Sequence, residues 1–201
     1  GLNRGTVTSC YATGAVTGEK LVGGLVGINS YGTMTSCYAT GAVTGEDSIG
    51  GLVAYNNRGT ISGCYAIGVV TKENDGGRAG GLTAAIYRPG TTFASFWDMD
   101  MVGQAGSASG KGLTSAQMTQ VSILQNAGWS KYNWVMREGE YPRLPWEGTG
   151  APPIPAAAPV PLSGSGTEGD PYRVETPQEF ALLSWHEAVL DAHILLMHDL
   201  D

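Results

Sequence analysis

Three cysteines recur at an interval of 27 residues, and their type and spacing are the first feature of this sequence that suggests chemistry. They are Cys10, Cys37 and Cys64. A soft-metal or redox site would need thiolates, and no histidine or basic residue recurs beside the cysteines to lower their pKa. An odd count at one repeated position also argues against a simple disulfide framework. The spacing therefore predicts a column of small, buried side chains packed on one another.

Histidines and carboxylates give weaker signals. All three histidines lie in the last 16 residues, and position 190 is Leu, so His186 and Glu187 do not begin a His-Glu-x-x-His zinc helix. Asp98, Asp100 and Gly103 form part of a calcium-loop pattern that lacks its later acidic positions, and calcium binding in this turn stays an open alternative. We predict no catalytic residue, no metal site and no cofactor, and a chain that is not an enzyme.

The composition argues against two kinds of partner. The 201 residues include 31 Gly and 10 Pro, only 14 % are charged, and the formal net charge is −7. Nucleic acid is not expected as a partner, because phosphate backbones demand a basic surface. No apolar stretch approaches the roughly 20 residues that a membrane helix needs, so we expect no membrane insertion of this segment.

The chain repeats itself with a period of 27 residues. Residues Gly5–Gly18, Gly32–Gly45 and Gly59–Lys72 nearly coincide, and each copy contains Gly-Thr, Cys-Tyr-Ala and Val-Thr at the same places. Gly-Gly-Leu elements lie between and after the copies, with their leucines at Leu25, Leu52 and Leu82. Such self-similarity is typical of repeat architectures.

A fourth, eroded copy runs from Gly90 to Asp98 after an insertion around residues 73–78. It has Ser95 at the cysteine position and Phe96 at the tyrosine position. An aromatic column results, made of Tyr11, Tyr38, Tyr65 and Phe96. Alternation along a strand places this column opposite inward cysteines, and therefore facing outward, where either stacking between coils or ligand contact would explain it.

Each repeat holds short runs of β-branched and small residues that are broken by glycines, without a helical stripe. We predict three short strands per repeat. One repeat cannot bury its own apolar face, so equivalent units should stack at about 4.8 Å into a right-handed parallel β-helix. The glycines would supply positive φ or close backbone approach at the corners. An antiparallel sandwich is the alternative, but it gives no reason for a fixed period.

The Gly-Gly-Leu-Val-Gly element at Gly23–Gly27 and the Cys-Tyr-Ala-Thr-Gly element resemble the GLUG-motif repeat. That family occurs in bacterial immunoglobulin A peptidases and in large surface or adhesin-like proteins. The resemblance covers about residues 1–98 and weakens toward the end, where Ala54 and Thr83-Ala84 depart from the motif. It implies an all-β solenoid and an extracellular module, and it supplies no catalytic residues.

A different pattern comes after the repeats. Thr114 and Gln117 have the spacing of a capping box, which predicts a helix from about Ser115 to Asn126. Segment 99–148 also resembles the closing segment of GLUG arrays. Trp129, Trp134 and Trp146 are expected to plug the last open coil, with a sugar-binding platform as the alternative.

The remaining residues predict a linker and a second module. Residues 149–166 are rich in proline and predict an extended linker. Residues 167–201 resemble the N-terminal cap of secreted β-helix domains, with a strand near 169–174, a helix to about Leu190 and a strand over 194–201.

These expectations lead to three hypotheses about function. The first is a noncatalytic structural or adhesion module of a large bacterial extracellular or cell-surface protein, with a glycan or a host or matrix protein as its partner. The second is an accessory fragment of a secreted carbohydrate-active enzyme or peptidase whose active site lies elsewhere. The third is a fibre subunit that self-associates through open solenoid ends.

Overall fold

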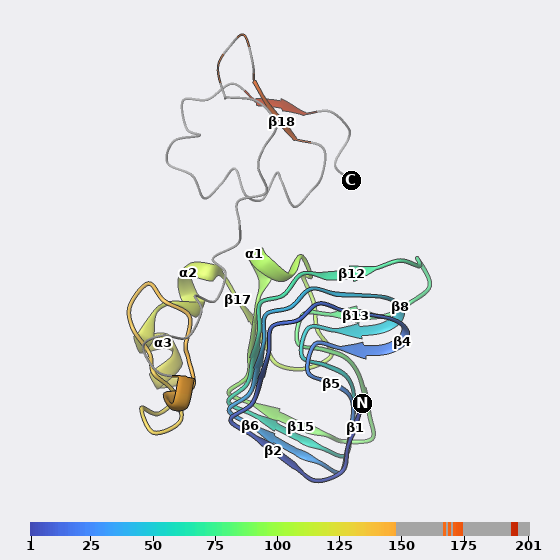
Figure 1. Cartoon of the computed structure of the whole chain (residues 1–201), viewed down its shortest axis with the longest axis vertical. Coiled ribbons are helices and arrows are strands. Elements are labelled where there is room, and N and C mark those ends of the chain that lie inside the picture. The colour runs from blue at the N-terminus through green and yellow to red at the C-terminus, as the bar shows by residue number, and fades with distance from the viewer. Residues whose placement is uncertain (148–166, 168, 170, 175–193, 197–201) are drawn as a thin grey trace. The chain divides into compact units, whose positions relative to one another are not determined.

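The computed structural model describes residues 1–147, 167, 169, 171–174 and 194–196. In the first part of the chain, parallel strands stack into four ladders that enclose one core (Figure 1). Successive strands in each ladder come from successive repeats, so each repeat forms one coil. The predicted all-β parallel solenoid is therefore confirmed.

The four ladders are named here sheets A to D. Sheet A stacks β1 (Leu2–Asn3), β5 (Val26–Ser30), β9 (Val53–Asn57) and β14 (Thr83–Tyr87). Sheet B stacks β2 (Thr6–Thr8), β6 (Thr33–Thr35), β10 (Thr60–Ser62) and β15 (Thr91–Phe93). Sheet C stacks β3 (Tyr11–Ala12), β7 (Tyr38–Ala39), β11 (Tyr65–Ala66), β16 (Phe96–Asp98) and β17 (Lys111–Leu113). Sheet D stacks β4 (Val16–Gly23), β8 (Val43–Gly50), β12 (Val70–Lys72) and β13 (Ala79–Gly80).

Each coil uses strands from four sheets, so the prediction of three strands per repeat is wrong. The extra corner separates the Thr-x-Thr strand from the Tyr-Ala strand. It is made by a residue in the left-handed region just before the cysteine position, namely Ser9, Ser36, Gly63 or Ala94. Alternation of residue types does not reveal this corner, because small polar residues also occur inside the strands.

The repeat glycines act mainly by close approach. A Cβ on Gly41 would lie 2.0 Å from the carbonyl oxygen of Gly14, and one on Gly68 equally close to that of Gly41. Coils could not stack at this spacing with any side chain there. The expected positive φ at glycine corners is found within the repeats only at Gly63, while larger residues adopt it elsewhere.

The interior of the solenoid is apolar. Met34, Ile49, Leu52, Ile61 and Leu82 are fully buried. Burial of such side chains contributes roughly 1.5–3 kcal/mol each, and the identical stacking makes the contribution recur with every coil.

The C-terminal end of the core is covered by α1 (Met99–Val102). Val102 is fully buried against the core residues of the solenoid. The residues after α1 continue two ladders, because the backbone N–H of Gly81 donates to Gly106 and that of Ala108 donates to Thr83. Helix α1 and the residues that follow it therefore close the last coil.

Beyond β17, the chain lies along sheet C and is called here the flank, residues 114–147. It contains α2 (Ser115–Met118), α3 (Val121–Asn126) and the 3-10 turn η1 (Pro145–Glu147). The predicted capping box of Thr114 and Gln117 is present. The predicted single helix is interrupted, because Gln120 has an extended backbone and Thr119 bonds back to the Ser115 carbonyl.

The chain divides into two compact units, Gly1–Ile154 and Pro155–Asp201. In the second unit, β18 (Tyr172–Val174) pairs in parallel with β19 (Ile194–Leu196). The boundary between the units falls inside the segment predicted as a linker. That linker and the predicted helix over residues 176–190 lie outside the described residues.

Candidate functional site

The cysteine column lies inside the solenoid. Cys37 and Cys64 are fully buried, and Cys10 in the first coil is partly buried. The backbone N–H of Cys37 donates to the Cys64 sulfur at 3.4 Å, and that of Cys64 donates to Ser95 Oγ at 3.0 Å. The column thus takes part in coil-to-coil bonding, and Ser95 fills the same place in the eroded copy.

The thiols are held in an apolar setting. Burial raises the pKa of Cys64 and also that of the less buried Cys10. The hydrogen bond with the Cys64 side chain lowers the pKa of Cys37, which opposes the effect of its own burial. All three cysteines are free thiols. Within the described residues, no group of three or more His, Cys, Asp or Glu could hold a metal ion.

The aromatic column faces away from the core, as alternation requires. Tyr11 pairs in register with Tyr38, Tyr38 with Tyr65, and Tyr65 with Phe96. The rings of Tyr38 and Tyr65 stack with centroids 4.9 Å apart and planes 7° apart, and Tyr11 stacks on Tyr38 at 5.1 Å. Yet Tyr38 and Tyr65 are only 1 % and 0 % exposed. The flank covers them, so these two rings are not available to a ligand.

The tryptophans pack differently from the expected plug over the last coil. Trp129 and Trp134 are buried on the aromatic column, with Trp134 centred 5.5 Å from Tyr65. Trp146 stacks on Tyr11 in the first coil at 5.5 Å, and its Nε1 donates to the Ser9 carbonyl. The prediction of an end plug is wrong because the tryptophans pack on the outward aromatic column, along the side of the coils.

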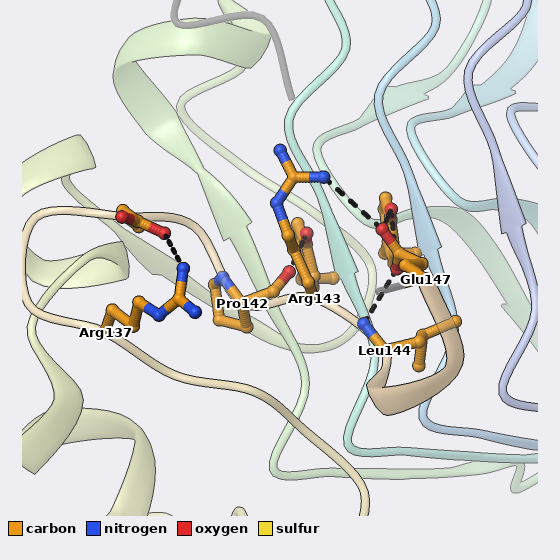
Figure 2. Close-up of polar contacts among 8 residues, drawn as sticks. Arg137, Pro142, Arg143, Leu144 and Glu147 are labelled. Atoms are coloured by element: carbon orange, nitrogen blue, oxygen red, sulfur yellow. Dashed lines mark hydrogen bonds and ion pairs between the residues drawn. The ribbon is translucent and has the colours of Figure 1, made fainter. Parts of the chain in front are cut away.

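Polar bonds anchor the flank to the aromatic column, and Figure 2 shows the contacts of Glu147 with Leu144 and Arg143 within the flank. The Tyr65 hydroxyl donates to the Pro142 carbonyl at 2.6 Å, and the Tyr38 hydroxyl donates to the Glu147 carboxylate at 3.0 Å. Glu147 also accepts from the Leu144 backbone N–H at 2.7 Å and pairs with Arg143 at 3.5 Å. Burial and the Glu147 charge raise the pKa of Tyr38, so its hydroxyl stays a donor. The tyrosines therefore serve as anchors.

A second anchor is built around Asp98, which begins α1. Its carboxylate accepts from the backbone N–H groups of Asp100 and Met101, from Ser115 Oγ at 2.7 Å and from the Tyr141 hydroxyl. Burial raises the pKa of Asp98 against the lowering effect of these donors. The Asp100 carboxylate accepts from the Ser115 backbone. The aspartates of the partial calcium pattern thus bind protein donors and join α1 to the flank.

The leucines of the Gly-Gly-Leu elements lie in the core. Leu52 and Leu82 are fully buried, and Leu25 is partly buried against the same core. The backbone N–H of Leu25 donates to Leu52, and that of Leu52 donates to Leu82. These residues position the coils and are not available for binding.

The exposed surface offers another set of residues, which sequence reasoning missed; Arg4, Tyr31, Arg58 and Arg88 follow equivalent strands, and two further tyrosines lie beside them. They lie at and beside the corner between sheets A and B, near β1 and β2 in Figure 1. We call them the corner ridge: Arg4, Tyr31, Tyr55, Arg58, Tyr87 and Arg88. Tyr31 is 62 % exposed and Tyr87 is 50 % exposed. The available signal was the large side chain just before Gly5, Gly32 and Gly59, with Arg88 two residues before Gly90.

The ridge side chains order one another. Arg58 Nη1 donates to the Tyr31 hydroxyl at 2.5 Å, and its guanidinium carbon lies 5.4 Å from the centroid of that ring. The Arg88 guanidinium lies 5.4 Å from the Tyr87 ring, which stacks with Tyr55 at 6.1 Å. Arginine against aromatic rings leaves the guanidinium hydrogens available for a further partner.

One cavity lies between the last coil and α3, with a volume of about 590 Å³. Phe93, Lys111, Ile123 and Asn126 are among its lining residues. Lys111 is the only charged residue among the described residues that line it. The cavity therefore does not bring an acid and a base together.

The fold defines a parallel β-solenoid repeat protein with an aromatic column covered by a lateral flank. Residues 18–44 match the family model of the GLUG motif, and this match spans one complete 27-residue period. It confirms the recognition of a GLUG-repeat family from the Gly-Gly-Leu and Cys-Tyr-Ala elements. No curated protein and no solved structure matched the chain. Among the described residues, no helix is long and apolar enough to cross a membrane.

Proposed function

We propose that this chain is a noncatalytic structural and adhesion module of a large bacterial extracellular or cell-surface protein. The match to the GLUG motif supports a repeat module. The resemblance of the repeats to those of large surface proteins supports an extracellular or cell-surface location. The main support comes from the distribution of the polar side chains. The polar groups beneath the flank form hydrogen bonds with the protein itself, whereas the arginines and tyrosines of the corner ridge face solvent.

The engaged state of the buried groups supports a noncatalytic role. The carboxylates of Asp98 and Glu147 are both surrounded by donors from the chain itself. The Tyr38 and Tyr65 hydroxyls each have a partner in the flank. A general acid or base must exchange a proton with a substrate within hydrogen-bond reach, and these groups use their bonds to hold the structure together.

The stacked coils also suit a structural role. Each coil bonds to the next through four ladders, and the ladders repeat in register along the axis. Such a quasi-one-dimensional body acts as a spacer along its axis and presents the same face repeatedly. This repetition favours adhesion, because several weak contacts to one polymer together give a higher overall affinity.

The proposal is tested by binding and by deletion. The full 201-residue chain, immobilised, is expected to bind a subset of a carbohydrate microarray or of matrix proteins on plates. Deletion of the repeats from the native parent protein is expected to reduce the attachment of intact cells to a surface coated with the ligand that the chain binds. Absence of both effects would reject adhesion, and retained surface display of the deleted parent controls for expression.

A further inference from the structure

Three residues of the corner ridge have an energetically unfavourable backbone conformation. Tyr31, Arg58 and Arg88 all have positive φ, at 59°, 55° and 55°. Bulky L-residues rarely adopt this conformation, and glycine or asparagine would adopt it at lower cost. At the corner between sheets B and C, the corresponding residues are small, namely Ser9, Ser36, Gly63 and Ala94. Strained backbone at large, exposed side chains is typical of positions kept for contact with a partner.

The backbone below the ridge is held firmly. Asn3 Nδ2 donates to Asn29 Oδ1 at 2.8 Å, and Asn29 Nδ2 donates to Asn56 Oδ1 at 3.1 Å. Asn29 and Asn56 are fully buried, and both also donate to the carbonyl of the glycine just after the turn. This ladder fixes the corner in the first three coils, so Tyr31 and Arg58 start from ordered positions and lose less entropy on binding. In the fourth coil, Ile86 takes the asparagine place, and Arg88 is ordered by the Tyr87 ring instead.

The charge of the ridge differs from that of the rest of the solenoid. Its three cations are exposed arginines, and the ion pairs found among the described residues lie in segment 137–147 and do not involve them. Apart from the buried Asp98, the acidic side chains of the repeats lie instead on sheet D and its turn, at Glu19, Glu46, Asp47, Glu73 and Asp75. A chain of net charge −7 therefore presents one positive edge along its axis.

We infer that the corner ridge binds a linear, carboxylated polysaccharide that runs along the solenoid axis. This inference rests on the proposed adhesion function and names its face and its ligand. Arginine forks match carboxylates in two-point hydrogen bonds, and the Tyr31 ring, which is 62 % exposed, offers apolar surface to a sugar ring. Arg58 and Arg88 directly follow the register partners Asn57 and Tyr87, whose strands stack at about 4.8 Å, so neighbouring carboxylates of one polymer can reach both.

Nucleic acid fits the ridge less well. Duplex DNA carries one charge per roughly 1.7 Å, and its binding needs many cations to replace the released counterions. Three arginines on a chain of net charge −7 cannot match that density. A polysaccharide with at most one carboxylate per sugar has the sparser charge that the ridge complements.

Polygalacturonate is the probe, with its methyl-esterified form as the ligand control. Isothermal titration with the full chain is expected to show binding that weakens with salt and is lost on esterification. The variant Arg58→Gln/Arg88→Gln should lose at least about tenfold in affinity, since each charged hydrogen bond contributes roughly that factor. The matched control Lys20→Gln/Lys131→Gln removes the same charge from exposed positions outside the ridge and should stay within about twofold.

Three outcomes would overturn the inference. They are no binding of polygalacturonate, equal affinity of the ridge variant and the control, and tighter binding of single-stranded DNA than of polygalacturonate. A microarray signal that persists in the ridge variant would still support adhesion and would place the binding site outside the ridge. Failure of the ridge and failure of the proposed function are therefore distinguishable. Unchanged far-UV circular dichroism of both variants shows that they fold.

Discussion

Replacing Tyr65 by phenylalanine removes one hydroxyl from the centre of the contact between the solenoid and the flank. That hydroxyl donates to the Pro142 carbonyl at 2.6 Å, and both residues are buried. The ring keeps its stacking on Tyr38, so packing changes little. The substitution therefore removes the donor of a buried acceptor and little else.

Leaving a buried carbonyl without a donor costs about 1–3 kcal/mol. For a domain of this size, each kcal/mol lowers the melting temperature by about 2–4 °C. Tyr65→Phe is therefore expected to lower the free energy of unfolding by about 2 kcal/mol and the melting temperature by about 4–8 °C. Tyr132→Phe is the matched control, because Tyr132 is 82 % exposed and should change stability by less than about 0.5 kcal/mol.

The assay is urea unfolding of the full chain, measured by tryptophan fluorescence and by far-UV circular dichroism. Three of the five tryptophans, including the buried Trp129 and Trp134, lie in the flank, so fluorescence is weighted toward the flank, whereas circular dichroism reports the ladders. A fluorescence transition that moves earlier than the circular dichroism transition would mean that the flank detaches first. Equal midpoints for Tyr65→Phe and Tyr132→Phe would refute the anchoring role of Tyr65.

Three further predictions concern the other buried groups. Glu147→Gln removes the charge that pairs with Arg143 and should destabilise the flank by about 3 kcal/mol, read from the same fluorescence transition; an unchanged midpoint contradicts it. Iodoacetamide under native conditions should alkylate Cys10 alone, with the two buried thiols reacting only in urea, as peptide masses would report. Burial raises the pKa of Asp98, so its contribution to stability is full below its ordinary value of 3.8 and is lost as the pH rises through the raised value. The stability of Asp98→Asn relative to the native chain should therefore increase as the pH rises above the ordinary value of 3.8, and a constant difference in urea midpoint would argue against this titration.

The sequence predicts the solenoid because its repeat is nearly exact. Identical residues at Cys37 and Cys64, and at Tyr38 and Tyr65, can occupy identical places only if the units stack in register. The inward direction of the cysteines and the outward direction of the tyrosines then result from alternation. The corner at Ser36 was missed because a left-handed serine leaves no mark in a pattern of small residues.

The position of the flank cannot be deduced from local pattern. Trp146 is distant in sequence from Tyr11, and only the folded chain shows that the two rings stack. The helix break at Gln120 has the same origin, since tertiary packing overrides the propensity of residues 115–126 to continue as one helix. The corner ridge was missed because its residues vary between repeats, whereas the search for repeats favours identical ones.

The claim that each 27-residue repeat forms one coil, stacked in register on the next, is tested most directly by a disulfide between equivalent residues. Thr44 and Thr71 are register partners, so their α-carbons lie about 4.8 Å apart, within the range of about 4.4–6.8 Å that a disulfide spans. Thr17 and Thr71 stand two coils apart, at about twice that distance.

The measurement is peptide mass mapping of the two double-cysteine variants after mild oxidation. Stacking in register predicts that Thr44→Cys/Thr71→Cys forms the cross-link in most molecules and that Thr17→Cys/Thr71→Cys does not. A cross-link in the two-coil pair with none in the one-coil pair would contradict the register on which the core, the aromatic column and the corner ridge all depend.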